Sequence, residues 1–258
     1  MELSEYVERL DDRLDTDAYA DVDASANGLQ VGPSGPTVDR NVDHVAFAVD
    51  AAMETIDAAT AAGADALVTH HGISWGGIDH VTGRTYDRIA ALSEAETALY
   101  VSHLPLDGHQ ELGNAAGVSD ELDLVDRRPF GELGPVTIGT AGTLSEPLVT
   151  AELRERLDRF EGSMTDTHVL PFGPETIEEV AVVTGSGVDW LDEAVDAGVD
   201  ALVTGEGKQQ VYHDAREAEI TVFLAGHYAT ETFGVRALQT LTEEWGIETT
   251  YVSHPTGL

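Results

Sequence analysis

An internal repeat limits the fold of this chain more than any other feature of its sequence. Residues 181–207 repeat residues 46–72 at a constant offset of 135 positions, as the central glycines Gly63 and Gly198 show (198 − 63). The eight residues that end at Thr69 and the eight that end at Thr204 differ at one position. Each copy has the pattern of a strand, a helix and a second strand. The repeat therefore predicts an α/β fold of two pseudo-repeated lobes, each with parallel strands.

The texture of the sequence changes after residue 126. From Arg127 to about Glu179, glycines and prolines interrupt β-prone residues, which is typical of short strands and turns. We therefore expect a first α/β lobe over residues 1–126 and a second over residues 127–258, closely packed together. A helical pattern from Thr230 to Trp245 is a candidate to pack on the first lobe.

The first copy of the repeat ends in two adjacent histidines. The apolar run from Ala66 to Thr69 is typical of a buried strand, and His70, His71 and Gly72 follow it. The C-terminal ends of strands are where open α/β sheets bind ligands. Successive side chains of a regular strand point to opposite faces, so both rings can serve one site only if the strand ends there, which a glycine permits. The alternative is one core histidine beside a surface one.

Other polar residues recur at the strand ends. In the second copy a glycine and Glu206 replace the histidine pair. Further along, a strand followed by His103 and Asp107 returns as a strand followed by His227 and Glu231, again with a spacing of four. We expect these ends to face each other across a pseudo-twofold axis and to form one site.

Five of these residues form a candidate metal-binding set of three imidazoles and two carboxylates: His70, His71, Asp107, His227 and Glu231. Such donors suit Zn, Fe or Mn and suit Cu(I) poorly. Five ligands exceed the needs of one tetrahedral ion, and they suit two divalent ions with positions left for water and substrate. His227 and Glu231 can reach a common ion if a helix begins at or just after His227, because residues four apart share a helix face.

Each residue also has a structural interpretation. Taken alone, Asp107 or Glu231 would be a solvated carboxylate or a helix cap. His103 suits a hydrogen bond to a ligand as well as it suits ligation. His213 lies in a helical stretch, where a structural role and an active-site role are equally supported. The recurrence of polar residues at equivalent strand ends favours the metal site.

Composition excludes several kinds of function. The chain has no cysteine, so disulfides, thiolate zinc sites and iron–sulfur clusters are excluded. Its 48 acidic and 13 basic residues give a formal net charge of −35, which argues against binding to nucleic acid or anionic membranes. The acids are spread along the chain, as on the surface of a salt-adapted protein. The N-terminus lacks a signal-peptide core and no stretch has the apolar length of a membrane span, so we expect a cytoplasmic protein.

Several short motifs follow one another in a specific order. They are Asn27-Gly28-Leu29-Gln30-Val31-Gly32, Thr69-His70-His71-Gly72, His103-Leu104-Pro105-Leu106-Asp107, Thr204-Gly205-Glu206-Gly207-Lys208 with Tyr212-His213-Asp214-Ala215, and Gly226-His227-Tyr228-Ala229-Thr230-Glu231. Their order and spacing resemble those of the GTP cyclohydrolase 1 type 2 homologues, the NIF-three-like dinuclear metal proteins. The resemblance covers nearly the whole chain after about residue 20.

This resemblance implies a two-lobed α/β fold, a dinuclear metal site in the cleft, and a toroidal homohexamer. It places His71 and Asp107 on one ion, His70 and His227 on the other, and Glu231 on both. His103 then lies outside the direct ligands.

The chain departs from the family pattern in the second copy of the repeat. The family usually has Gly-Asp-x-Lys-Tyr-His there, whereas Glu206 replaces the Asp and residues 209–211 intervene before Tyr212 and His213. Lys208 is the only lysine of the chain, which suggests that its charge or its donors are needed.

The resemblance further implies a metal-dependent hydrolase that opens the imidazole ring of the guanine in GTP with a metal-activated water and releases formate. Glu206, His103 or His213 would move protons, and Lys208 or an arginine would meet the triphosphate. No P-loop supports nucleotide binding independently. Two alternatives stay open: a non-catalytic metal-binding or regulatory ring protein, and a metallohydrolase of another substrate. Open coordination positions distinguish a catalytic site from a structural one.

Overall fold

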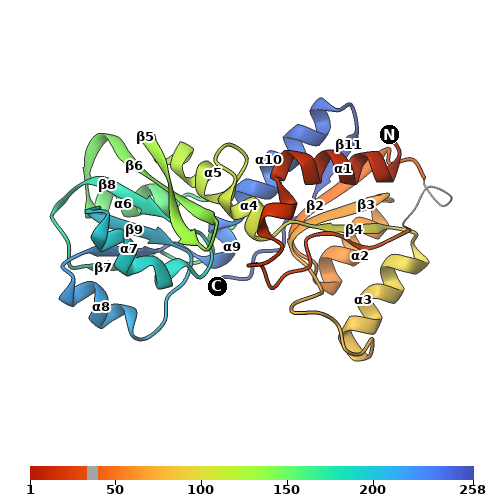
Figure 1. The fold of residues 1–258 in the computed structure, drawn as a ribbon, viewed down its shortest axis with the longest axis horizontal. Helices are drawn as coiled ribbons and strands as arrows, with labels where there is room; N and C mark the ends of the chain where they lie inside the picture. The colour runs from red at the N-terminus through yellow and green to blue at the C-terminus, as the bar shows by residue number, and fades with distance from the viewer. Residues whose placement is uncertain (34–39) are drawn as a thin grey trace. The chain divides into compact units, whose positions relative to one another are not determined.

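The computed structural model describes residues 1–33 and 40–258. The chain divides into two compact units, which we call unit 1 (Met1–Leu106 and Gly234–His254) and unit 2 (Asp107–Phe233 and Pro255–Leu258). Each unit has one β-sheet with helices packed on it (Figure 1). The prediction of an α/β fold in two parts is confirmed.

Unit 1 contains a five-stranded sheet with the strand order β1-β4-β3-β2-β11. Its strands are β1 (Gly28–Val31), β2 (His44–Asp50), β3 (Ala66–His71), β4 (Ala98–Val101) and β11 (Glu248–Tyr251). The strands from β4 to β11 are parallel, and β1 is antiparallel at one edge. The central strands are apolar on both faces, as strands covered on both sides must be.

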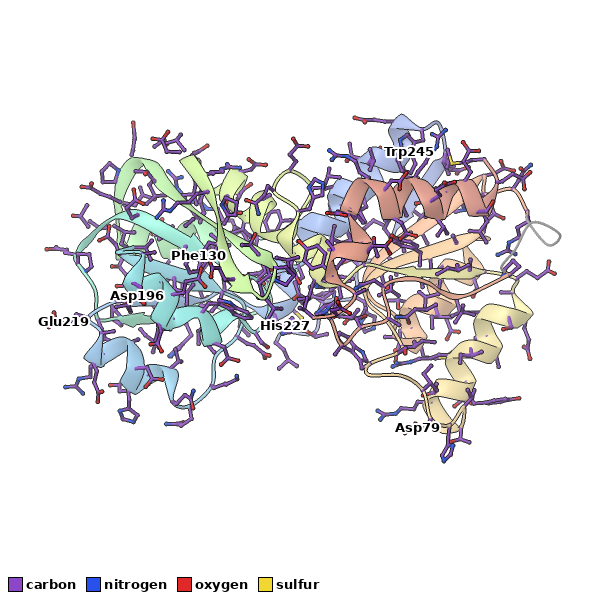
Figure 2. All side chains as sticks on the ribbon, in the orientation of Figure 1. Asp79, Phe130, Asp196, Glu219, His227 and Trp245 are labelled. Atoms are coloured by element: carbon purple, nitrogen blue, oxygen red, sulfur yellow. The ribbon has the colours of Figure 1, made fainter. Side chains whose placement is uncertain are left out.

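Helices cover both faces of this sheet, with α1 and α10 on one face and α2 and α3 on the other (Figure 1). Their bounds are α1 (Leu3–Leu14), α2 (Met53–Ala61), α3 (Gly83–Glu94) and α10 (Thr232–Glu244). The short η1 (Thr16–Tyr19) also belongs to unit 1, and α4 (Leu104–Gly108) contains the change from unit 1 to unit 2. Tyr6 of α1 is fully buried, and its hydroxyl shares a hydrogen bond of 3.0 Å with that of Thr242. Its ring lies 5.8 Å from the ring of Trp245. Trp245 directly follows α10 (Figure 2). The segment after residue 233 is thereby packed onto the first helix of the chain.

Unit 2 contains a six-stranded sheet with the strand order β5-β6-β8-β9-β10-β7. Its strands are β5 (Leu124–Leu133), β6 (Val136–Val149), β7 (His168–Pro171), β8 (Thr176–Val182), β9 (Ala201–Thr204) and β10 (Thr221–Leu224). Its helices are α5 (Asn114–Glu121), α6 (Thr150–Leu157), η2 (Gly187–Trp190), α7 (Leu191–Asp196), α8 (Val211–Glu217) and α9 (His227–Thr230). β8, β9 and β10 are parallel, and the other pairs are antiparallel.

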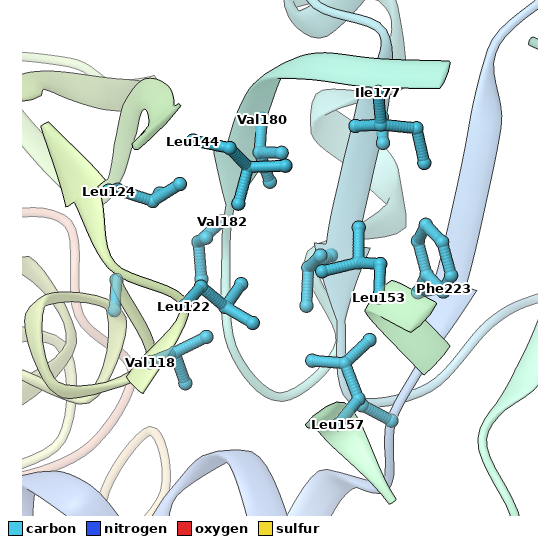
Figure 3. Packing of buried hydrophobic residues seen from close by; sticks show 14 of the residues in the cluster. Val118, Leu122, Leu124, Leu144, Leu153, Leu157, Ile177, Val180, Val182 and Phe223 are labelled. Atoms are coloured by element: carbon cyan, nitrogen blue, oxygen red, sulfur yellow. The ribbon is translucent and has the colours of Figure 1, made fainter. Parts of the chain in front are cut away.

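The core of unit 2 shows why the chain changes unit at Leu106, before the expected position 126. Val118 of α5 and Leu122 just after it are fully buried, in one apolar cluster with Leu153 of α6 and Phe223 of β10 (Figure 3). Burying each such side chain contributes about 1.5–3 kcal/mol, so α5 is held to the second sheet. The segment from residue 107 to residue 126 therefore belongs with unit 2.

The repeat seen in the sequence corresponds to matching structures. β2, α2 and β3 form a parallel βαβ arrangement in unit 1, and β8, α7 and β9 form the same arrangement in unit 2. Gly63 and Gly198, at equivalent positions, both adopt a φ of 71°, in the left-handed region that favours glycine. The repeat thus preserves the turn that leads from the helix into each second strand.

Candidate metal centre

The two adjacent histidines lie at the end of β3 in unit 1. β3 spans Ala66–His71, so the strand does not end before the histidines as expected but includes both and ends just before Gly72. Although the strand runs through both residues, their ring centroids are only 4.6 Å apart. The last residue of β2 and the residue that follows β4 bind the two rings. Nδ1 of His70 lies 2.9 Å from the carbonyl oxygen of Ser102, and Nδ1 of His71 lies 2.9 Å from Oδ1 of Asp50.

His103 brings a third imidazole to the same place. It follows β4, and its ring centroid is 5.1 Å from that of His70 and 5.7 Å from that of His71. Its Nδ1 lies 2.8 Å from Oδ1 of Asp23. The three histidines offer ligand atoms that all lie within 4.8 Å of one another. We call these three residues the histidine cluster.

All three rings of the histidine cluster direct the same nitrogen, Nδ1, at an oxygen atom. Each Nδ1 faces an oxygen that can only accept, so we assign the ring hydrogen to Nδ1. Nε2 then carries the lone pair that a metal ion uses. A ring that donates through one nitrogen to a carboxylate or a carbonyl and binds through the other is the usual state of a metal-ligating histidine. The cluster therefore fits a metal ion of the Zn, Fe or Mn type.

A buried carboxylate holds His103 in place. The side chain of Asp23 is fully buried, and besides His103 it accepts hydrogen bonds from Asn27 Nδ2 (2.8 Å) and from the backbone of Ser25 (2.8 Å) and Leu104 (2.9 Å). Burial raises the pKa of Asp23, but His103 and these donors outweigh burial and hold the pKa below its usual value. Asp23 therefore remains an ionised acceptor.

Unit 2 contributes a second group of donors. Glu231 is buried, and its Oε1 lies 3.1 Å from Nε2 of His227. The expected helix through both residues is not continuous, because α9 ends at Thr230 and α10 begins at Thr232, which leaves Glu231 at the break. The spacing of four nevertheless brings the two side chains together.

Glu206 binds the other nitrogen of His227. Its Oε1 lies 3.1 Å from Nδ1 of His227, and it accepts a hydrogen bond from the hydroxyl of Ser186. The Ser186 hydrogen bond, aided by His227 and opposed by partial burial, lowers the pKa of Glu206. Burial lowers the pKa of His227, but Glu231 and Glu206 outweigh burial and raise it to about 9. Glu206 is thus placed to orient His227.

Asp107 is the other buried carboxylate of unit 2. It lies in α4, and its Oδ1 accepts hydrogen bonds from Asn114 Nδ2 (2.9 Å) and Thr184 Oγ1 (3.0 Å). Asp107 and Glu231 offer carboxylate oxygens within 4.8 Å of each other. Buried carboxylates are rare unless they are paired or bind a metal, so this pair suits a cation.

Gly185 leaves the space that the carboxylate of Glu231 occupies. Its φ is 59°, and a Cβ atom at this position would collide with Oε1 of Glu231 and lie 3.2 Å from Nε2 of His227. No pattern in the sequence distinguishes this glycine from the others.

Lys208 and His213 contact residues other than the candidate ligands. Nζ of Lys208 bonds to both carboxylate oxygens of Asp189 at 2.5–2.6 Å, and both side chains are about half exposed. His213 is exposed on α8, with its ring 5.4 Å from that of Tyr212. The structure thus pairs the only lysine with a carboxylate of η2.

The fold and these donors define an α/β protein with a candidate metal centre of imidazoles and carboxylates. Residues 1–256 match the model of the Duf34/NIF3 (NGG1p interacting factor 3) family, and the chain belongs to that family. The resemblance noted in the sequence is thereby confirmed.

Individual relatives agree with this assignment. A protein of Halobacterium salinarum named "GTP cyclohydrolase 1 type 2 homolog" is 56% identical, and the match covers 100% of both chains. Among solved structures, the structural-genomics protein ybgI, of unknown function, has a TM-score of 0.90 and 32% identity. TTHA1606 of Thermus thermophilus has a TM-score of 0.89 and 34% identity, and both structural matches cover 100% of each chain. Within the described part of this chain, no helix has the length and apolar character needed to cross a membrane.

Proposed function

We propose that this protein is a metal-dependent hydrolase that binds two divalent ions of Fe, Mn or Zn. The ligands we propose are His70, His71, Asp107, His227 and Glu231. One observation carries the proposal: the three rings of the histidine cluster all hold an oxygen acceptor at Nδ1 and converge within 4.8 Å. Histidines that serve only in packing need no such shared orientation.

The donors of unit 2 support the same proposal. Asp107 and Glu231 are 7% and 2% exposed, and a carboxylate at such depth is costly unless a positive charge is near. His227 supplies one such charge while it is protonated, since its pKa is raised to about 9. A divalent ion would replace that proton and turn His227 into a neutral ligand.

Bound ions of this kind supply a water of lowered pKa and polarise the substrate atom that the water attacks. The remaining residues would position groups and move protons. His103 donates its Nδ1 hydrogen to Asp23 in a hydrogen bond. Nε2 is therefore the atom with which His103 can accept a proton. Glu206 keeps His227 in one orientation through Nδ1. We propose that Lys208 meets a substrate phosphate after leaving Asp189, and that His213 has at most an auxiliary role.

The names of the relatives suggest the substrate. Several relatives that match nearly the whole chain are named "GTP cyclohydrolase 1 type 2 homolog". We propose that one water adds to C8 of the guanine of GTP and that the C8–N9 bond breaks, which leaves a formamide on N7 and a hydrogen on N9. A second water then hydrolyses the formamide and releases formate.

We further propose that the protein acts in the cytoplasm. We also propose that it assembles as a toroidal homohexamer, as the resemblance implies. Light scattering in concentrated KCl tests the assembly. A monomer would contradict the hexamer but would not contradict the proposed metal site.

The function is tested by metal analysis of the purified protein together with mass spectrometry of its reactions with GTP and other nucleotides, all in high salt. Wild type should contain close to two metal ions per chain and release formate from GTP. Glu231→Ala should lose metal and activity. Glu244→Ala, which removes an exposed carboxylate of α10, is the matched control and should retain both.

Two results would overturn parts of this proposal. Stoichiometric metal without turnover of any nucleotide would contradict the cyclohydrolase reaction and support a non-catalytic metal-binding protein. Wild type that stays free of metal after incubation with Fe, Mn or Zn would contradict the metal site itself.

A further inference from the structure

A large aromatic side chain lies exposed against the histidine cluster. The ring of Trp75 is 4.9 Å from that of His103, nearly perpendicular to it, and 5.9 Å from that of His71. Yet Trp75 is 46% exposed. An indole side chain is usually largely buried, so one that stays half exposed beside polar groups points to a binding role.

The backbone fixes Trp75 in this position. Trp75 forms an isolated antiparallel β-bridge with Ser25, and hydrogen bonds on either side join Ala26 N to the Ser74 carbonyl (3.2 Å) and Gly76 N to the Ala24 carbonyl (2.6 Å). The segment bonded to Trp75 directly follows Asp23, which holds His103. The indole and the ring of His103 are therefore positioned by the same short stretch of chain.

Glycines then lead the chain away from Trp75. Gly76 and Gly77 have φ values of 65° and 100°, which other residues rarely adopt, so the chain turns immediately after the tryptophan. Such a turn leaves the indole accessible next to the candidate ligands. The arrangement resembles the aromatic platforms on which proteins stack planar bases, since every base has a π-face that can pack on an indole.

We propose that Trp75 is a stacking platform for a planar heteroaromatic ring, and that it selects nucleobase-type substrates at the histidine cluster. This inference rests on the proposed function for the identity of the site, but it makes a separate claim, because it concerns recognition of the ring and not its hydrolysis. A ring stacked on the indole would lie beside His71, a proposed metal ligand, and His103.

Binding measurements on the metal-loaded protein in high salt test this proposal. Calorimetric titration would compare GTP, guanosine and inorganic tripolyphosphate, the last of which has no ring. Trp75→Ala and Trp75→Leu should weaken binding of GTP and guanosine by roughly tenfold, since base stacking on an aromatic residue contributes about 1–3 kcal/mol. Trp75→Phe should retain most of the affinity, and tripolyphosphate should bind all variants equally.

Fluorescence supplies a readout that does not depend on activity. The chain has three tryptophans, and binding of guanosine should quench the emission of Trp75. The quench should vanish in Trp75→Phe and persist in Trp190→Phe, whose indole is bonded to the carbonyl of Glu132 in unit 2. Circular dichroism of each variant shows that it is folded.

The outcomes separate this inference from the proposed hydrolase. Equal affinity of wild type, Trp75→Ala and Trp75→Leu for guanosine would overturn the platform, even if GTP is turned over. Absence of any binding of ring compounds to wild type would overturn it too. Binding that depends on Trp75 without turnover would support the platform while contradicting the cyclohydrolase reaction.

Discussion

Asp50 and His71 contact each other twice, as partners in the β2–β3 ladder and through a hydrogen bond of 2.9 Å between Oδ1 and Nδ1. The backbone pairing fixes where the carboxylate lies relative to the ring, so His71 keeps one orientation without a long loop to hold it. This is the strand-end version of the support that Asp23 gives to His103.

Asp50→Ala should weaken metal binding by roughly 10–100-fold, which is the usual effect of removing the carboxylate behind a metal-binding histidine. The affinity is measured by competition with a chelator of known strength. Asp43→Ala removes an exposed carboxylate just before the same strand and should leave the affinity unchanged. Equal affinities in both variants would show that Asp50 does not support a ligand.

Gly185→Ala should reduce metal content, because the added methyl group would collide with the carboxylate of Glu231. Gly198→Ala is a close control: its φ of 71° imposes similar backbone strain, roughly 1–3 kcal/mol, but no heavy atom lies within 4 Å of its Cβ position. Both variants should unfold at lower temperature, and only Gly185→Ala should lose metal in elemental analysis. Loss of metal in both would mean that strain alone disturbs the site.

The metal-free protein should lose stability as the pH rises through about 9. The pKa of His227 is raised from 6.5 to about 9 in the folded chain by Glu231 and Glu206, against the effect of burial. The folded state thus binds the proton more tightly than the unfolded state, so this contribution is complete below pH 6.5 and disappears above about pH 9. Denaturant unfolding at pH 6, 8 and 10 measures it, and the difference between wild type and His227→Gln should shrink over that interval. A constant difference would contradict the raised pKa.

Salt should stabilise the folded protein strongly. With a net charge of −35, the acidic side chains repel one another in the compact state. Salt screens this repulsion, and the screening length falls from about 10 Å at 0.1 M salt to about 3 Å at 1 M. The thermal unfolding midpoint should therefore rise steadily with KCl concentration, and NaCl should act alike. A midpoint that does not change with salt would show that the acidic surface is not self-repelling.

Much of the fold follows from periodicity in the sequence. The helical pattern from Thr230 to Trp245 corresponds to α10, which spans Thr232–Glu244. The parallel strands of both repeats are equally recognisable, because they are short apolar runs that end at polar residues. The change of unit at Leu106 is not visible in this way, since the small and apolar residues of α5 do not reveal which sheet they will pack on.

Some residues of the candidate site can likewise be selected from the sequence and others cannot. His70 and His71 can be selected because they follow an apolar strand pattern, and Glu231 because it lies four residues after His227. Asp50 also ends a strand and could have been found by the same reasoning. Asp23 stands in an irregular loop far from His103 in sequence, so only the folded chain shows their contact.

Unit 1 is assembled from two stretches of chain, and its strand β11 pairs with β2, the strand that ends in Asp50. On the ribosome, every strand of unit 2 is therefore synthesised before the edge of the first sheet can be closed. A nascent chain released before residue 248 would expose that edge of β2 to other chains, as unpaired strands do. The strand whose last residue, Asp50, supports His71 thus gains its second neighbour only after every strand of unit 2 has been synthesised.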